Sequence, residues 1–139
     1  MTVEGNEQIK NSLTENRWFR LAKDQCLNSL HQTRFGAVLI LKNGKYFSAC
    51  NVEKSHPLIR KHYNYFAVSI HAELNTLLRV NVVRHRHQIA GSTFYLYRED
   101  RNGWLKAARP CPVCLSIMRD AGVKKCFHTM PDGYKLIYL

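Results

Sequence analysis

Two short segments of the sequence carry side chains of the kinds that bind a metal ion. His71 and Glu73 stand two positions apart, and Cys111 and Cys114 follow with the spacing C-x-x-C. One imidazole nitrogen and two thiolate sulfurs suit Zn²⁺, and three protein ligands leave the fourth tetrahedral position to water. Because Glu73 is so close to His71, we expect it to reach that water and pass a proton to a substrate nitrogen. The pattern predicts hydrolytic metal chemistry.

Both segments are expected to lie at helix starts. The apolar spacing predicts one helix over 69–78. A second is predicted over 112–121, with Pro112 in its first turn and Gly122 after its end. The start of a helix carries a partial positive charge, which favours thiolates and a water that has lost a proton. Two helix starts aimed at one point would therefore assemble the predicted metal site.

The remaining elements must hold these two helices in position. Hydrophobic patterning predicts a helix over 15–30 and strands over 35–41, 46–50, 93–97, 125–129 and 134–138. Asn43-Gly44 predicts a tight hairpin between the first two strands, and the short turn at 131–133 forces the last two strands to run antiparallel. Residues 51–68 are expected to form a long loop and residues 1–14 a loose lead-in. The predicted order is α-β-β-α-β-α-β-β.

Together, the sequences H-A-E at 71–73 and P-C-P-V-C at 110–114 resemble the signature of the cytidine/deoxycytidylate deaminase superfamily. The resemblance covers about residues 17–139. It implies a single domain over 1–139 with a three-layer α/β fold, in which helices flank a five-stranded mixed sheet that ends in an antiparallel hairpin. It also implies a hydrolase with one catalytic Zn²⁺ per chain, held by His71, Cys111 and Cys114. In such an enzyme Glu73 carries the proton while cytosine becomes uracil and ammonia is released.

The resemblance further implies residues that contact the substrate. The backbone at Ala72 and at Pro110 is expected to orient the base, while Asn51 and Glu53 resemble the pair that binds ribose hydroxyls in free-cytidine deaminases. The antiparallel final hairpin is also typical of that branch. His71 is instead typical of deaminases that act on nucleotides or nucleic acids, because free-cytidine deaminases have Cys at this position. These features favour different substrates.

The charge of the chain adds a second indication about the substrate. With 21 Lys and Arg against 10 Asp and Glu, the formal net charge is +11, and the whole excess follows residue 30. Such a surplus favours phosphate-bearing partners, although it also serves solubility alone. We expect His56 and Arg109 to contact the substrate, and Trp104 either to stack on a base or to cover a hydrophobic edge.

Three functions remain open at this stage. The leading hypothesis is deamination of a free cytidine or deoxycytidine nucleoside or nucleotide, and the alternative is deamination of cytosine in single-stranded DNA or RNA. A third is a non-catalytic nucleic-acid-binding protein with a structural zinc, whose fourth ligand would be His56, Cys126 or His128. Glu73 argues against the third hypothesis, because a structural site does not use a proton carrier. A redox C-x-x-C pair is disfavoured because the element order is not that of thioredoxin.

Composition excludes several other classes of protein. Hydrophobic residues make up 45% and charged residues 22% of the chain, which is typical of a globular protein and not of a disordered or collagen-like one. There is no apolar run of the roughly 18 residues that a membrane span needs, so no membrane partner is expected. An odd number of cysteines, five, and no signal pattern predict a cytoplasmic location. A homo-oligomer is implied only by the resemblance.

Overall fold

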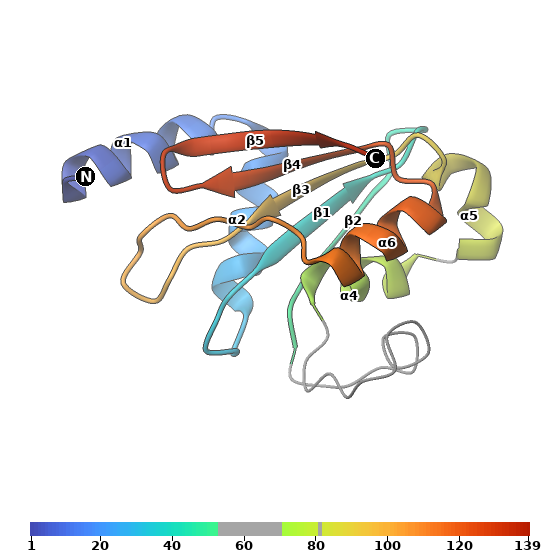
Figure 1. Cartoon of the computed structure of the whole chain (residues 1–139), viewed down its shortest axis with the longest axis horizontal. Coiled ribbons are helices and arrows are strands. Elements are labelled where there is room, and N and C mark those ends of the chain that lie inside the picture. Colours follow the sequence, from blue (N-terminus) through green and yellow to red (C-terminus); the bar gives the residue numbers. More distant parts are fainter. Residues whose placement is uncertain (53–70, 81) are drawn as a thin grey trace.

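A five-stranded mixed sheet lies at the centre of the protein, in a computed structural model that describes residues 1–52, 71–80 and 82–139 (Figure 1). The strand order is β2-β1-β3-β4-β5. The bounds are Gly36–Ile40 for β1, Tyr46–Cys50 for β2, Thr93–Tyr97 for β3, Lys125–Met130 for β4 and Gly133–Tyr138 for β5. β3 and β4 are parallel, and the other pairings between these strands are antiparallel. The predicted sheet and its C-terminal antiparallel hairpin are therefore confirmed.

Helices cover both faces of this sheet and give the predicted three layers (Figure 1). Their bounds are Val3–Leu13 for α1, Arg17–Asn28 for α2, Ala72–Arg79 for α4, Val82–Ile89 for α5 and Pro112–Ala121 for α6. α2 packs on one face, while α4 and α6 pack on the other. α6 has its predicted bounds and ends at Gly122, whose φ of 96° is a left-handed conformation that glycine adopts without strain.

The first strand is buried on both faces, as its continuous apolar sequence predicts. Val38 faces the cluster under α2, whereas Ala37 and Leu39 face the cluster under α4 and α6, and all three are fully buried. At Gly36 a Cβ would overlap the backbone of Ala22 and Cys26 in α2. The glycine therefore allows α2 to lie directly on the sheet.

The prediction of a loose lead-in over residues 1–14 is wrong, because α1 occupies most of that segment. The helix is capped by Thr2, whose side chain accepts a hydrogen bond from the Gly5 amide at 2.9 Å. Its buried residues include the polar Asn6 and Lys10 besides Leu13. A helix that buries polar side chains has a weak hydrophobic period, which is why the apolar pattern does not reveal it.

The partners of these polar side chains lie about ninety residues away in the sequence. Lys10 Nζ donates to the Gly103 carbonyl at 2.8 Å and to Glu99 Oε2 at 3.3 Å. The Asn6 side chain donates to the same carbonyl and accepts from the Leu105 amide, both at 3.0 Å. α1 therefore anchors the segment between β3 and α6, which leads to the two cysteines.

The structure also adds α5, which the sequence analysis did not predict and which carries the basic residues after α4. The predicted helix over 69–78 begins at Ala72. Most of the predicted loop over 51–68 lies outside the described residues, as do residues 69 and 70. Among the helices that the structure describes, each is too short or too polar to cross a bilayer.

Candidate active site

The starts of α4 and α6 lie together on one face of the sheet and bring three metal-binding side chains into contact. His71 is the N-cap residue of α4, and Cys111 is the N-cap residue of α6. The Sγ atoms of Cys111 and Cys114 lie 3.5 Å and 3.3 Å from Nδ1 of His71. The three ligand atoms all lie within 4.8 Å of one another, although the cysteines are 40 or more positions from the histidine in sequence.

These distances fit a zinc ion. A tetrahedral Zn²⁺ about 2.3 Å from sulfur and about 2.0 Å from nitrogen places those ligand atoms roughly 3.5 Å apart. In the described part of the chain, this is the one group of three or more His, Cys, Asp or Glu residues that could hold a metal ion. Cys126 and His128 are fully buried in β4 and do not belong to it, and His56 lies outside the described residues. The donor set is that of a three-ligand site.

Hydrogen bonds within the cluster shift the pKa values of its side chains. The Cys114 thiol donates to Cys111, and with help from His71 and the Cys114 amide this lowers the pKa of Cys111 to about 4. The same bond raises the pKa of Cys114, and contact with Cys111 raises the pKa of His71. A cation bound here would favour the thiolate form of both cysteines, because metal binding to a thiol releases its proton.

Glu73 lies in the first turn of α4, beside this cluster. Its side chain is buried, and the residue is 5% exposed. Burial raises the pKa of the Glu73 carboxyl, while the charge of His71 opposes this effect. Glu73, His71 and Cys111 line one small cavity of about 90 Å³, so a carboxyl group faces the same space as two side chains that could hold a metal ion.

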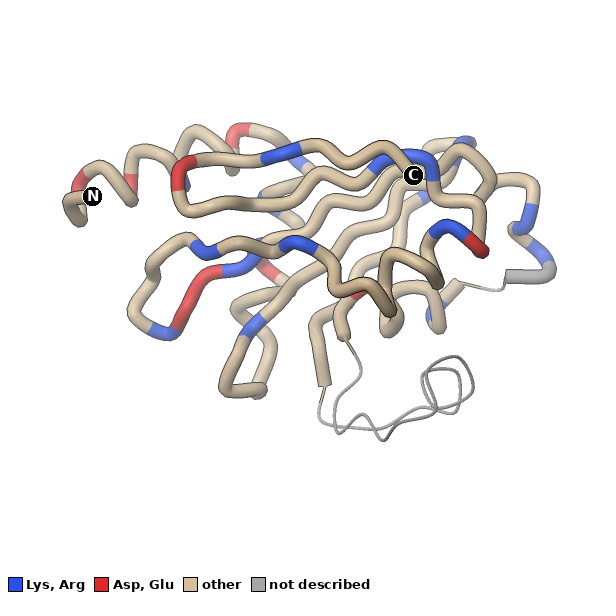
Figure 2. Tube along the Cα trace, viewed as in Figure 1, with Lys and Arg blue, Asp and Glu red and all other residues tan. Residues whose placement is uncertain are grey.

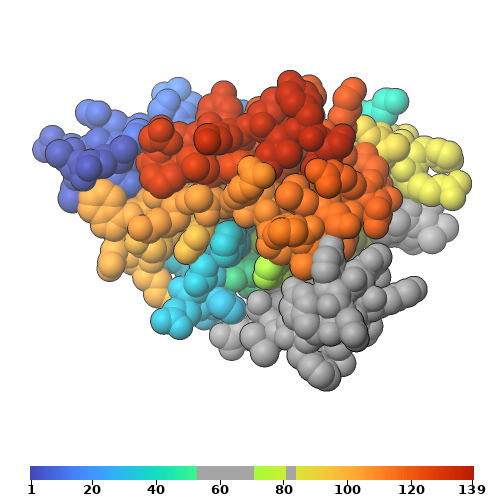
Figure 3. Space-filling view, in the orientation of Figure 1, coloured from blue at the N-terminus to red at the C-terminus, as the bar shows by residue number. Residues whose placement is uncertain are grey.

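Two further residues among those that the structure describes line this metal cavity: Phe35, just before β1, and Arg109, just before the cysteines. Arg109 is exposed, whereas Ala72 and Pro110 beside it are buried. Figure 3 shows the light-green start of α4 between the cyan segment that leads into β1 and the orange segment that precedes α6. Sequence analysis missed Phe35, because no local pattern brings the start of β1 against a helix that begins far along the chain.

Asn51 is placed next to the metal cavity without lining it. Its Oδ1 accepts hydrogen bonds from Ser29 Oγ at 2.7 Å and from the Phe35 amide at 2.9 Å, and its Nδ2 donates to the Thr33 carbonyl at 2.6 Å. Asn51 thus fixes the backbone of Phe35. Direct contact between Asn51 and a ribose stays a prediction.

The other predicted substrate residues lie elsewhere. Trp104 sits in the turn between β3 and α6, where its backbone amide donates to Asp100 Oδ1 at 2.9 Å, and it does not line the metal cavity. The predicted stacking of Trp104 on a base stays a prediction. Glu53 and His56 lie outside the described residues.

Comparisons with known proteins agree with this geometry. The family model of the cytidine and deoxycytidylate deaminase zinc-binding region matches residues 13–130. The cytidine deaminase of Burkholderia pseudomallei is similar in structure, with a TM-score of 0.63 and 19% identity over 88% of this chain and 90% of that one. The cytidine deaminase of Mycobacterium leprae gives a TM-score of 0.49 and 17% identity over 88% and 92%. No curated protein sequence matches the chain.

Proposed function

The chain belongs to the cytidine and deoxycytidylate deaminase zinc-binding family, and from this premise we propose that it deaminates cytosine in a free cytidine or deoxycytidine nucleoside or nucleotide. Family membership makes it a zinc-dependent deaminase, a hydrolase with one catalytic zinc. We assign His71, Cys111 and Cys114 as the ligands of that zinc. The observation that carries the proposal is the placement of Glu73 beside these ligands in one enclosed cavity.

The reaction consumes one water and releases one ammonia. A zinc ion held by this cluster supplies acidified water at neutral pH. Glu73 takes a proton from the water and delivers it to N3 of the cytosine ring while the water oxygen bonds to C4. Glu73 then takes the proton of the new C4 hydroxyl and passes it to the exocyclic nitrogen. The C4 carbonyl forms as the bond from C4 to that nitrogen breaks, and ammonia leaves. Because Glu73 is buried, it exchanges this proton with the substrate and not with bulk water.

The lining of the metal cavity favours a small substrate. The Phe35 ring offers an apolar surface for a base, and the buried backbone at Ala72 and Pro110 is assigned to orient it. Among the described residues, Arg109 is the one Lys or Arg that lines this cavity. The guanidinium of Arg109 can pair with the phosphate of a mononucleotide.

A substrate panel tests the proposal. Chromatography would follow conversion of cytidine, deoxycytidine, dCMP, dCTP and short single-stranded DNA and RNA oligomers to their uracil products. We expect turnover of monomers, and none with Glu73→Ala. Conversion of oligomers while every monomer stays unchanged would overturn the proposed substrate class and favour the nucleic-acid alternative.

A matched pair of arginine variants sharpens the assignment of Arg109. Arg109→Ala should raise the KM for dCMP at least tenfold, in the range of about 1.5–3 kcal/mol for a hydrogen bond to a charged group, and leave the KM for deoxycytidine unchanged. Arg119→Ala removes the same charge at the far end of α6 and should change neither value. Equal effects of Arg109→Ala on both substrates would contradict phosphate binding.

A further inference from the structure

Beyond α2, aromatic rings line the part of the same sheet face that β3, β4 and β5 form, where Tyr95 and Phe127 are half-buried and Tyr134 and Tyr138 are exposed. Tyr95, Phe127 and Leu136 lie in register across β3, β4 and β5, in the same row as Val38, which α2 covers. Tyr134 and Tyr138 flank Leu136 on that side and are 55% and 68% exposed. With Trp18 of α2, these rings form a surface that we call the aromatic face, which consists of Trp18, Tyr95, Phe127, Tyr134 and Tyr138.

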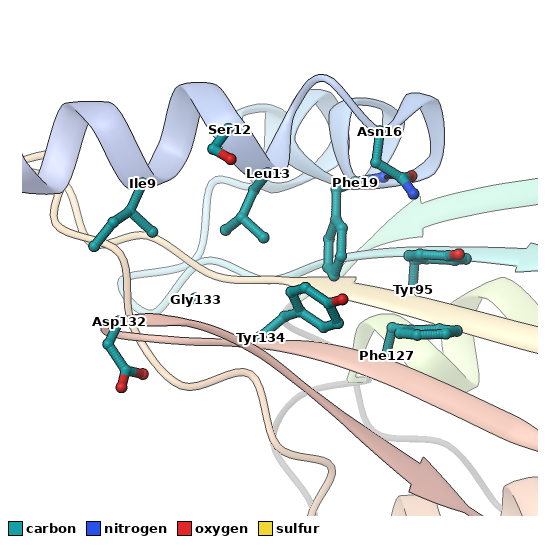
Figure 4. A pocket seen from close by; sticks show the side chains of 10 residues that line it. All are labelled: Ile9, Ser12, Leu13, Asn16, Phe19, Tyr95, Phe127, Asp132, Gly133 and Tyr134. Carbon is teal, nitrogen blue, oxygen red and sulfur yellow. Dashed lines mark hydrogen bonds between the residues drawn. The ribbon is translucent and has the colours of Figure 1, made fainter.

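Two hollows meet on this surface. A cavity of about 370 Å³ lies between α1 and the turn that joins β4 to β5, where Tyr134 lies near Phe19 (Figure 4). A second hollow of about 320 Å³ runs from Trp18 toward the start of β4. Tyr95 and Phe127 line both, and their rings stack at 4.7 Å with 12° between their planes. The two hollows therefore lie next to each other and share the stacked rings of Tyr95 and Phe127 as lining.

Positively charged side chains lie at the edges of the aromatic face. The Arg17 guanidinium lies 4.5 Å from the centre of the Trp18 ring, and Lys125 Nζ lies 5.9 Å from the Tyr138 ring. Lys42 contributes a third charge nearby, since its Cδ atom lies 4.0 Å from where a Cβ of Gly91 would be and Gly91 lines the second hollow. Figure 2 shows blue positions gathered beside the C terminus, where β4 begins and β5 ends. Asp132 lines the first hollow, and no acidic residue of the described chain lines the second.

We propose that the aromatic face binds single-stranded nucleic acid, at a site separate from the metal cavity. Every nucleobase has a flat face that stacks on an aromatic side chain, and neighbouring cations bind the phosphates. Arg17, Lys42 and Lys125 supply those cations, and the +11 charge of the chain attracts a polyanion to them. A second copy of the chain would instead bring the same cations against one another, so charge disfavours a symmetric pairing here.

The proposal does not rest on the substrate of the metal cavity. Tyr95 and Phe127 point to the α2 side of the sheet, whereas Phe94 and Cys126, their neighbours in β3 and β4, lie in the cluster packed against α4 and α6. The sheet itself separates the two sites. A monomer deaminase and an oligomer deaminase would both keep this second surface.

Fluorescence anisotropy with labelled dT12 and rU12 tests the proposal on the intact protein. We expect both oligomers to bind at 50 mM salt, because stacking tolerates sequence and sugar type. Three phosphate contacts predict that affinity falls about 20-fold between 50 and 200 mM salt, since the logarithm of the affinity falls by ~0.7 per contact for each tenfold rise in salt. No binding of either oligomer at 50 mM salt would overturn the proposal.

Substitutions on the same strands identify the surface. Tyr134→Ala and Tyr138→Ala should each weaken binding at least about fivefold, the lower limit for loss of one stacked base. Both should leave monomer deamination unchanged, because the rings lie on the face opposite the metal cavity. Tyr138→Ala should also leave the melting temperature unchanged, because its ring is 68% exposed, whereas the Tyr134 ring contacts Phe19. Lys125→Ala should weaken binding and reduce the salt dependence. Lys135→Ala is the control, because Lys135 lies opposite His128 in the strand register and on the other face of the sheet. This variant should change neither the affinity for the oligomers nor its salt dependence.

Two results would contradict the proposal that the aromatic face binds the oligomers. If Arg109→Ala abolished oligomer binding while both tyrosine variants bound normally, the metal cavity would be the binding site and the proposal would be overturned. If the tyrosine variants converted a dimer into a monomer in sedimentation and oligomer binding did not change, the aromatic face would be an interface between copies.

Discussion

The two faces of the sheet use the same five strands in opposite ways. On the face of α4 and α6, side chains such as Leu39, Phe94 and Leu96 are fully covered, and two of the assigned metal ligands line a cavity of about 90 Å³. On the other face, α2 covers β1 and part of β3, and the rings beyond it surround hollows of about 370 and 320 Å³.

This difference has a geometric cause. α4 and α6 both begin at one point, so their first turns place ligands and a buried carboxyl within hydrogen-bonding reach. α2 and α1 lie on their face without sharing an end, and they leave β5 largely open. This hydrolysis needs one water held in a fixed position and bulk solvent kept out, whereas stacking on bases needs only an exposed ring and a nearby cation. The closed face therefore suits catalysis, and the open face suits binding that tolerates many sequences.

Loss of a ligand should produce the largest effect and confine it to the closed face. We expect Cys114→Ala to reduce zinc from one per chain to near zero and to abolish deamination, while oligomer binding stays normal. Metal analysis and the substrate panel measure the first two effects. Cys50→Ala, outside the cluster, is the control. A Cys114→Ala protein that kept its zinc would contradict the ligand assignment.

Replacement of the proton carrier should spare the metal. Glu73→Gln keeps the size of the side chain and removes its ability to carry a proton, so kcat should fall about 10²–10⁴-fold. Zinc content should stay at one per chain, because Glu73 is assigned no bond to the metal. A variant that turned over within tenfold of the unchanged protein would show that another group moves the proton.

The contact between Lys10 of α1 and Glu99 should affect the stability of the protein and not the rate of deamination. Lys10 and Glu99 are 6% and 4% exposed, so Lys10→Met leaves a buried carboxylate without its cation. We expect the free energy of unfolding to fall by about 3–5 kcal/mol, with kcat nearly unchanged in the folded fraction. Urea unfolding measures this free energy. The double variant Lys10→Met/Glu99→Gln should regain much of the stability that Lys10→Met loses, because it no longer buries an unpaired carboxylate. A double variant no more stable than Lys10→Met alone would show that the pair is not the cause.

The smallest expected effect is a pH dependence on the closed face. Burial, followed by the charges of Arg109 and Lys135, lowers the pKa of His128 in the folded protein, so it stays neutral where the unfolded chain becomes protonated. The free energy of unfolding should therefore fall as pH drops below about 6.5, the ordinary pKa of His. His128→Gln should flatten this decline between pH 7.5 and 5.5, whereas His87→Gln on exposed α5 should not. If the free energy of unfolding of His128→Gln fell with pH as steeply as that of the unchanged protein, His128 would not be the cause of the decline.

Local sequence determined much of the closed face. The C-x-x-C spacing behind Pro110, Pro112 at the helix start and Gly122 at its end all act within one helix, so they predict α6 and its ligands without knowledge of other elements. The Asn43-Gly44 turn and the short turn after β4 determined strand directions in the same way. Each of these features depends on neighbours a few residues apart.

Tertiary structure alone decided the rest, because the deciding contacts join distant parts of the chain. α1 is a helix with a polar buried side, and its partners Glu99 and Gly103 follow about ninety residues later. Phe35 lines the metal cavity only because β1 lies beside helices that begin at residues 72 and 112. The rings of β3, β4 and β5 form one surface because the strand order continues the row past α2, which contacts Tyr95 and Tyr134 through the Phe19 ring. Local patterning determines what each segment becomes, and packing between distant segments determines what each surface faces.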